Sequence, residues 1–204
     1  MTHNLKKMLK NAQSYLLSAA FLVLAYANTV QAGNTAAHEG NEAAYYFTGD
    51  LAVINDIIVA NNLEQYRQKP EMLGIQVWQD GRLTFLMITE NNMVSVLPQS
   101  IGNLTELRGL YLSNQNLLQL PETIGQLDKL ESLHADNNRL QTLPASIGNL
   151  QLLKSLYVQN NQLVSLPYTI QNLSHLKTLN LSGNKLNETA FEALPLNELS
   201  EFYQ

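Results

Sequence analysis

The sequence predicts a solenoid of the α/β class, in which short strands stack into one parallel β-sheet and short helices or turns return the chain along the opposite side. Three observations support this prediction. The chain repeats itself at a fixed interval, each repeat holds a short segment of alternating apolar residues, and each repeat holds a Leu-Pro pair. One such unit cannot bury its apolar side alone, so stacked copies must share a continuous core.

The repeat is defined by columns of residues that recur at the same spacing. The Leu-Pro pairs begin at Leu97, Leu120, Leu143 and Leu166. An isoleucine column contains Ile101, Ile124, Ile147 and Ile170, a leucine column contains Leu104, Leu127, Leu150 and Leu173, and a glycine column contains Gly102, Gly125 and Gly148, with Gln171 in the fourth place. The segment LxxLxLxxNxL then occupies residues 107–117, 130–140, 153–163 and 176–186, with Gln115 in place of the first Asn. We therefore predict four full repeats, at 97–119, 120–142, 143–165 and 166–188.

Within each LxLxx segment, alternate residues of a strand point to opposite faces, so the leucines enter the core and the intervening residues face outward. Proline fits the returning half because no sheet N–H is needed there. Together these motifs resemble the leucine-rich-repeat family. The resemblance implies a right-handed solenoid with its parallel sheet on a concave face, short helices or turns on the convex face, and an N-terminal cap.

In that family the asparagine side chain bonds backbone groups of neighbouring turns, which would otherwise be buried unpaired. The resemblance therefore implies a structural ladder of amide side chains: Asn91, Gln115, Asn138, Asn161 and Asn184. Gln115 carries its amide one methylene further out, so its contribution to the ladder is an open question.

Two incomplete repeats flank the full ones. The first, at 83–96, matches the strand half through Leu83, Leu86, Ile88, Asn91 and Met93. One extra residue then precedes Leu97, which we interpret as a small bulge between Met93 and Leu97. The last, at 189–204, matches through Leu196, Leu199 and Phe202. The sequence leaves open whether this final strand is a natural cap or the mark of a truncated product.

Residues 49–82 are predicted to form an N-terminal cap. Leu51, Ile54 and Ile58, with Val59 as a further candidate, have helical spacing behind Asp50, which we expect to be the helix N-cap. Asp80-Gly81 then predicts a β-hairpin. The order of helix and hairpin resembles the cap of plant-type and bacterial secreted leucine-rich-repeat proteins. Trp78 is expected to plug the core edge; the alternative role for it is ligand stacking.

Residues 1–32 predict a secretory signal peptide and residues 33–48 a flexible linker. Three lysines precede the apolar stretch 15–27, and Val30-Gln31-Ala32 places small residues where signal peptidase cleaves. An apolar run of about 13 residues is shorter than the roughly 20 that span a membrane, although a retained anchor and an earlier cut after Ala27 are alternatives. The prediction is a secreted or periplasmic protein that is not inserted in a membrane after cleavage.

Composition excludes several functions. The whole chain has a net charge of -5, and without the three lysines of the leader it has 9 basic and 17 acidic residues. Nucleic acids and anionic membranes require clustered basic residues, so neither is expected as a partner. The absence of cysteine excludes thiol catalysis and zinc ribbons. No catalytic motif occurs, so we predict no enzyme activity and no cofactor.

The outward-facing strand positions of successive repeats form columns that predict a binding surface for a protein ligand. The central column contains Met87, Tyr111, His134, Tyr157, Asn180 and Tyr203. A neighbouring column contains Thr89, Ser113, Asp136, Gln159 and Ser182, and the column on the other side contains Phe85, Gly109, Ser132, Ser155 and Thr178. Tyrosine gives large contact area and a hydroxyl at low entropic cost, which is typical of protein-binding surfaces.

Three alternatives accompany this prediction. Tyrosine is also common on exposed strands that bind nothing, because it is a good strand former. His134 and Asp136 lie two residues apart on the same face, but no third ligand has a supporting spacing, so no metal site is predicted. Finally, the chain could be an adhesion or cell-envelope structural protein that assembles through the edges of its solenoid. The partner's identity and the oligomeric state are not predictable from the sequence.

Overall fold

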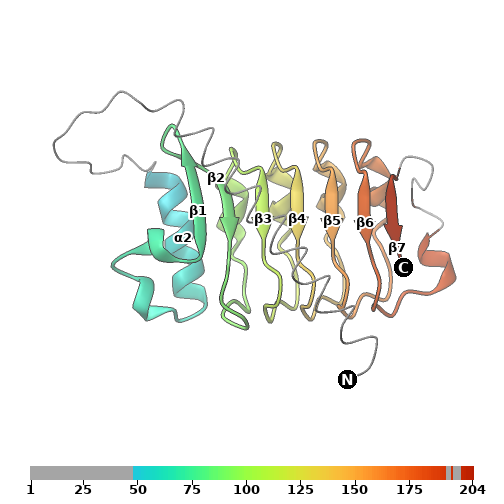
Figure 1. Ribbon diagram of the computed structural model, residues 1–204, viewed down its shortest axis with the longest axis horizontal. Coiled ribbons are helices and arrows are strands. Elements are labelled where there is room, and N and C mark those ends of the chain that lie inside the picture. Colours follow the sequence, from blue (N-terminus) through green and yellow to red (C-terminus); the bar gives the residue numbers. More distant parts are fainter. Residues whose placement is uncertain (1–47, 192–193, 195–198) are drawn as a thin grey trace, which may run out of the picture. The chain divides into compact units, whose positions relative to one another are not determined.

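The computed structural model describes residues 48–191, 194 and 199–204, and the predicted signal peptide lies outside them, as does the predicted linker up to residue 47. The described chain begins with helix α2 (Thr48–Ala60) and two short 3-10 helices, η1 (Glu64–Tyr66) and η2 (Pro70–Met72). The hairpin of β1 (Ile75–Gln79) and β2 (Arg82–Met87) follows. Figure 1 shows α2 beside this hairpin, at the end of the sheet where the solenoid begins.

One sheet contains seven strands in chain order, and every pair from β2 to β7 is parallel. After β2 come β3 (Gly109–Tyr111), β4 (Ser132–His134), β5 (Ser155–Tyr157), β6 (Thr178–Asn180) and β7 (Glu201–Tyr203). Each of the returning segments contains a 3-10 helix: η3 (Gln99–Asn103), η4 (Glu122–Gln126), η5 (Ala145–Asn149), η6 (Tyr168–Asn172) and η7 (Glu188–Phe191). The predicted α/β solenoid of stacked strands and short return helices is therefore confirmed (Figure 1).

The core lies between the sheet and the 3-10 helices and is built from the predicted columns. The middle leucines of β3 to β6, for example Leu110 and Leu133, have no exposed surface, and neither do the isoleucines of the return helices, such as Ile124. After each strand the chain turns through a residue with positive φ, at Asn114, Asn137, Asn160 and Gly183. Asparagine and glycine tolerate this left-handed conformation better than other residues, so the same turn recurs in each repeat.

The glycine column allows neighbouring 3-10 helices to pack closely. A Cβ on Gly125 would collide with the carbonyl oxygen of Ser146, and one on Gly148 would collide with that of Thr169. The fourth place holds Gln171, which is exposed, and the following 3-10 helix, η7, begins earlier in its repeat than the others do. The column therefore requires glycine only where another return helix stacks against it in register.

Asp50 does not act as the predicted N-cap. It lies inside α2, fully buried, and its carboxylate accepts hydrogen bonds from the Arg82 guanidinium at 2.9 and 3.0 Å and from the Leu83 N–H at 2.8 Å. A buried carboxylate needs such partners, and here they join the helix to the first strand of the parallel sheet. Of the predicted positions, Ile54 and Ile58 are buried, Leu51 is half-buried and Val59 is 54% exposed; Val53 and Ile57, which were not predicted, are buried too.

The predicted hairpin is confirmed. Asp80 and Gly81 both have positive φ, as a two-residue type I′ turn requires, and β1 pairs with β2 in antiparallel fashion. Trp78 is half-buried against the core and its indole N–H donates to Gln76 Oε1 at 3.1 Å. β2 therefore joins the cap to the solenoid, because it pairs with β1 in antiparallel and with β3 in parallel fashion.

The extra residue of the first repeat is not between Met93 and Leu97, as predicted, but directly after β2. Ile88 N–H donates to the carbonyl of Tyr111, which lies one full repeat length along the chain. Asn92 N–H donates to the carbonyl of Asn114, which is one residue short of that length. One residue is therefore inserted between Ile88 and Asn92. Val94, rather than Met93, consequently takes the buried place that leucine holds in the other repeats.

None of the helices within the described ranges is both long and apolar enough to cross a membrane.

Candidate protein-binding surface

The candidate surface, which we call the open sheet face, consists of the side chains of β2 to β7 that point away from the core and of the predicted neighbouring column, which lies just after the strands: Thr89, Ser113, Asp136, Gln159 and Ser182. The strand register aligns the predicted central column in full: Met87, Tyr111, His134, Tyr157, Asn180 and Tyr203. It also aligns the column beside it: Phe85, Gly109, Ser132, Ser155, Thr178 and Glu201. Corresponding residues are therefore about 4.7–4.9 Å apart along each column.

Four aromatic rings on this face form a continuous stack across β2 to β5, which we call the ring stack. Phe85 lies against Tyr111 at 4.9 Å between ring centroids, with a tilt of 40°. Tyr111 and His134 are stacked at 4.1 Å and 14°, and His134 and Tyr157 at 4.3 Å and 23°. The spacing of the strands matches the separation that aromatic rings prefer, so the repeat itself creates the stack.

Two small residues make room for the ring stack and orient it. A Cβ on Gly109 would lie 2.7 Å from the Phe85 ring, so glycine is what allows Phe85 to reach Tyr111. Ser132 Oγ lies 3.1 Å from His134 Nε2 and 3.4 Å from the Tyr111 hydroxyl. Burial lowers the pKa of His134 to about 3, so its ring is neutral at physiological pH and stacks as an uncharged aromatic group.

The neighbouring column places Asp136 and Gln159 beside the ring stack. Asp136 Oδ1 accepts a hydrogen bond from Ser113 Oγ at 2.6 Å, and Oδ2 accepts one from Asn137 Nδ2 at 2.7 Å. Burial raises the pKa of Asp136, and these hydrogen bonds oppose the rise. Gln159 Oε1 is enclosed and accepts no hydrogen bond from any residue that the structure describes.

The other predicted surface residues lie at the ends of this arrangement. Asn180 Oδ1 accepts from Ser182 N–H at 3.2 Å and from its hydroxyl at 2.8 Å, so this amide oxygen is used within the repeat. Tyr203 is 47% exposed on the last strand, and Met87 lies on the first strand beside Tyr111. The ring stack, with Asp136 and Gln159, is thus the part of the predicted surface where neighbouring side chains form one unit.

The amide ladder lies on the inner side of the turns that follow the strands. Asn138 Oδ1 accepts from Leu117 N–H at 2.9 Å, and its Nδ2 donates to the carbonyl of Leu112 at 2.8 Å. Asn161 and Asn184 make the equivalent bonds one and two repeats later. Gln115 also joins the ladder, through Met93 N–H, Val94 N–H and the Glu90 carbonyl at 3.0, 2.9 and 2.7 Å.

Asn91 does not take the place in the ladder that was predicted for it, because the inserted residue shifts it out of register and leaves it exposed. Asn61, in the turn after α2, makes comparable bonds instead. Its Oδ1 accepts from Ser95 N–H at 2.8 Å and Val96 N–H at 2.9 Å, and its Nδ2 donates to the carbonyls of Ile57 and Val96 at 2.8 Å. Asn61 lies outside the repeats, so periodicity could not reveal it.

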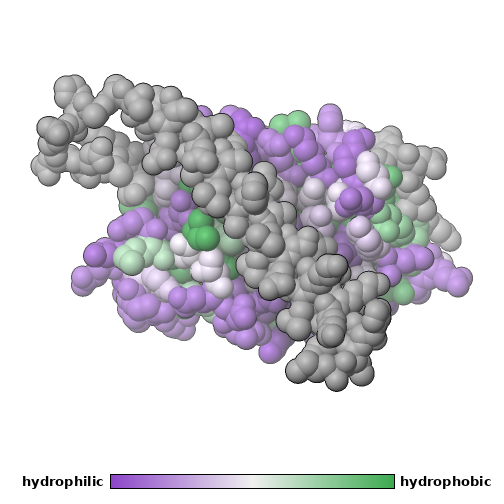
Figure 2. Space-filling view, viewed as in Figure 1, coloured by the Kyte–Doolittle hydropathy of each residue, from purple (hydrophilic) through white to green (hydrophobic). Residues whose placement is uncertain are grey.

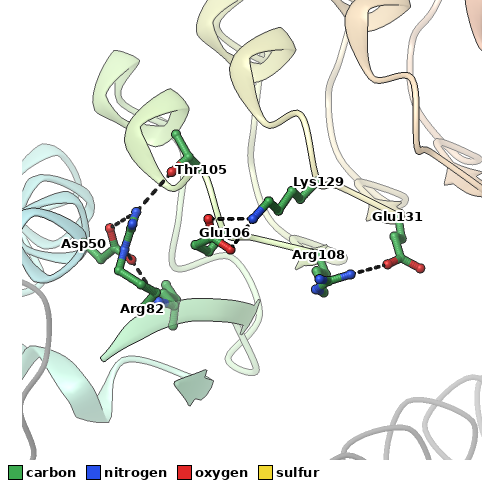
Figure 3. A network of polar contacts seen from close by, with 8 residues as sticks. Asp50, Arg82, Thr105, Glu106, Arg108, Lys129 and Glu131 are labelled. Carbon is green, nitrogen blue, oxygen red and sulfur yellow. Dashed lines mark hydrogen bonds and ion pairs between the residues drawn. The ribbon is translucent and has the colours of Figure 1, made fainter. Parts of the chain in front are cut away.

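The sequence analysis also missed a series of ion pairs along the edge where the strands begin (Figure 3). Lys129 Nζ lies 2.6 Å from Glu106, and Glu131 bridges Arg108 at 2.9 Å and Lys154 at 2.6 Å. The signal was present, because each pair joins opposite charges that are one repeat length apart in the sequence. A hollow of about 280 Å³ opens beside these pairs, but Arg82, Glu106 and Arg108 in its lining already have partners.

Family models match most of the described chain. The model described as "Leucine-rich repeat region" matches residues 63–158, and the model described as "Leucine Rich Repeat" matches residues 152–173 and 175–197. The chain is a leucine-rich-repeat protein. This fold is commonly a protein-interaction module. No curated protein sequence matches this leucine-rich-repeat protein significantly.

Solved structures support the same fold. A leucine-rich-repeat protein of Leptospira interrogans is 28% identical with a TM-score of 0.54, over 70% of this chain and 45% of that one. A plant ice-binding protein is 22% identical with a TM-score of 0.60, over 70% and 50% of the two chains. A chain of the BIR3–SERK2 complex of Arabidopsis thaliana is 22% identical with a TM-score of 0.55, over 67% of this chain and 82% of that one. This leucine-rich-repeat protein thus spans about half the length of the first two, and the identities of 22% show the fold alone.

Metal binding has no support in the part of the leucine-rich-repeat protein that the structure describes. Within it, no three or more His, Cys, Asp or Glu residues lie close enough together to hold a metal ion. His134 and Asp136 project from the same face, but their contacts are with stacked rings and with hydrogen-bond donors.

Proposed function

We propose that this chain is a non-enzymatic protein-binding module, exported to the periplasm or secreted, that holds its partner on the open sheet face. The observation that carries the proposal is the ring stack of Phe85, Tyr111, His134 and Tyr157. Phe85, His134 and Tyr157 are half-buried and Tyr111 is 9% exposed, so the row offers the outer parts of its rings, held by the backbone and by each other, with little side-chain entropy left to lose. Aromatic residues at the centre of an interface contribute much of its binding energy.

The polar character of the surroundings agrees with a protein partner. Where the described residues are visible in Figure 2, the surface is mainly hydrophilic, with small separate apolar areas. A central set of aromatic residues with a polar rim is the usual anatomy of an interface between proteins that also exist apart. The proposed export rests on the signal peptide that the sequence predicts in residues 1–32. N-terminal sequencing of the exported protein tests it, and a chain that still begins at Met1 would contradict this part of the proposal.

The binding surface is tested by affinity capture from the native extracellular or periplasmic fraction. Wild-type protein and the double variant Tyr111→Ala, Tyr157→Ala serve as bait, and the affinity for each captured protein is then measured. Loss of two interface tyrosines should weaken binding by about 2–4 kcal/mol, or roughly 30-fold or more. Tyr168→Ala is the control, because Tyr168 is 72% exposed on η6, away from the sheet. Equal affinity of the double variant and wild type would exclude the open sheet face.

A further inference from the structure

The charged groups on the open sheet face are all acidic. Its three columns contain Asp136 and Glu201 but no lysine or arginine, and His134 is neutral. The cations Arg108 and Lys154 lie at the other ends of the strands, where Glu131 pairs with both. Within the described chain Asp136 forms no ion pair. The carboxyl group of Asp136, at the centre of the face, therefore has no cationic partner among the described residues.

Acceptors also outnumber donors at this point. A carboxylate offers about four acceptor sites, and on Asp136 three donors use them: Ser113, Asn137 and the backbone N–H of Asp136 itself. In the next repeat, just after β5, Gln159 Oε1 has no donor among the described residues. The N–H of Asn137, the residue after Asp136, donates to the Gln159 carbonyl at 2.9 Å, so Asp136 and Gln159 lie on neighbouring segments of backbone. A group that only donates hydrogen bonds would satisfy both side chains, and the ammonium and guanidinium groups have this property.

The ring stack is placed to hold the rest of such a side chain. His134 and Tyr157 are the last residues of β4 and β5, and Asp136 and Gln159 follow them by two residues, which is about 6.5 Å of extended chain. The aliphatic stem of lysine or arginine covers that distance and packs on apolar surface while its charge stays beside a polar group.

We infer that the open sheet face recognises a peptide segment of its protein partner through a lysine or arginine side chain, with the cationic group between Asp136 and Gln159 and the stem over His134 and Tyr157. This inference rests on the proposed function, because it takes protein binding at this face as given. It adds the chemical class of the residue that is recognised.

The test is a selection from a random heptapeptide display library on the immobilised full chain, followed by affinity measurement on the synthesised peptides. We expect the enriched peptides to share a lysine or arginine. Replacing that residue by norleucine keeps the stem and removes the charge, and should weaken binding about tenfold or more, as expected for a charge-assisted hydrogen bond. Asp136→Asn should weaken the same peptides by a similar factor.

The matched control is Asp128→Asn, which removes the same charge from an exposed position between η4 and β4 and should leave affinity unchanged. If Asp136→Asn does not fold, the norleucine peptide still decides the matter, since it needs no protein variant. Enriched peptides without lysine or arginine, a norleucine effect below twofold, or no enrichment would each overturn the inference.

Failure of the inference and failure of the proposed function give different patterns. Peptides that lose affinity on Tyr111→Ala, Tyr157→Ala but not on Asp136→Asn would overturn the cation inference and leave the open sheet face as the binding surface. Peptides that are indifferent to both sets of substitutions bind elsewhere, and that result would overturn both.

Discussion

The amide of Gln115 accepts hydrogen bonds from two backbone N–H groups of the preceding turn, Met93 and Val94, whereas Asn138 accepts from one, Leu117. The preceding turn is also the one that contains an inserted residue, between Ile88 and Asn92. The extra methylene of glutamine is thus matched to a wider turn. The two irregularities of the sequence, the inserted residue and the glutamine in place of asparagine, therefore belong together: the longer side chain reaches the N–H groups of the wider turn.

We therefore expect Gln115→Asn to destabilise the protein, although it restores the residue of the other repeats. The shorter side chain cannot keep both the Glu90 carbonyl and the two N–H groups, and a buried group without a partner costs about 1–3 kcal/mol. Denaturant unfolding measures the loss of free energy. Gln119→Asn, the same change at an exposed position, is the control and should be neutral. An unaltered midpoint for Gln115→Asn would show that asparagine spans the turn equally well.

Local pattern alone could not reveal the roles of Asn91 and Asp50. Asn91 lies in a stretch where an insertion can be placed at several positions with the same apolar spacing, and only the hydrogen bonds of the neighbouring strand fix the choice. Asp50 precedes an apolar periodic segment as an N-cap would, but α2 already includes Thr48, and Asp50 is the buried partner of Arg82. Both errors concern single polar residues whose contacts come from distant parts of the chain.

At the scale of elements, the strands and return helices were predictable because their apolar columns recur at a fixed spacing. The core positions of β3 to β6, the parallel register and the hairpin at Asp80-Gly81 all follow from periodicity or from turn chemistry. The column of residues on the open sheet face was predictable for the same reason. Whether its rings would touch was not, because ring stacking depends on rotamers and on the space above Gly109.

The contact between return helices gives a prediction at this scale. Gly148→Ala should destabilise the protein by several kcal/mol, on the order of 2–4, because the new methyl group would meet backbone of η6 rather than a flexible side chain. Gln171→Ala, in the same column but without a return helix stacked on it in register, should change stability little. Thermal and denaturant unfolding of both variants provide the comparison, and equal effects would mean that the glycine column has no packing role.

For the whole molecule, ion pairs link successive repeats along one edge of the sheet, in addition to the continuous core. Glu131 contacts Arg108 of the preceding repeat and Lys154 of the following one, and Glu106 contacts Lys129. These side chains are partly exposed, so each pair contributes modestly. Each pair joins neighbouring repeats, as the apolar contacts do, and through Glu131 two of the pairs connect three adjacent repeats.

This coupling should appear as acid sensitivity. The Lys154 ammonium lowers the pKa of Glu131 from its usual value; partial burial opposes this effect and Arg108 adds to it. Lys129 lowers the pKa of Glu106 in the same way. A carboxylate whose pKa is lower in the folded state stabilises that state above its unfolded pKa, and the contribution is lost as pH falls through the folded value. Stability should therefore decline as the pH is lowered below about 4.5. The raised pKa of Asp136 acts in the opposite direction, so the total slope mixes both effects.

Glu131→Gln isolates the contribution of the ion pairs. The variant should be slightly less stable than wild type at pH 7, and the difference should shrink as the pH falls below about 4.5 and through the lowered pKa of Glu131, where the wild-type side chain also becomes protonated. Added salt should also reduce the difference at pH 7. Glu188→Gln is the control, at an exposed glutamate that forms no ion pair within the described part of the chain. Chemical unfolding from pH 3 to 7 gives the comparison, and a Glu131→Gln difference independent of pH would show that the side chain stabilises the solenoid by packing rather than by charge.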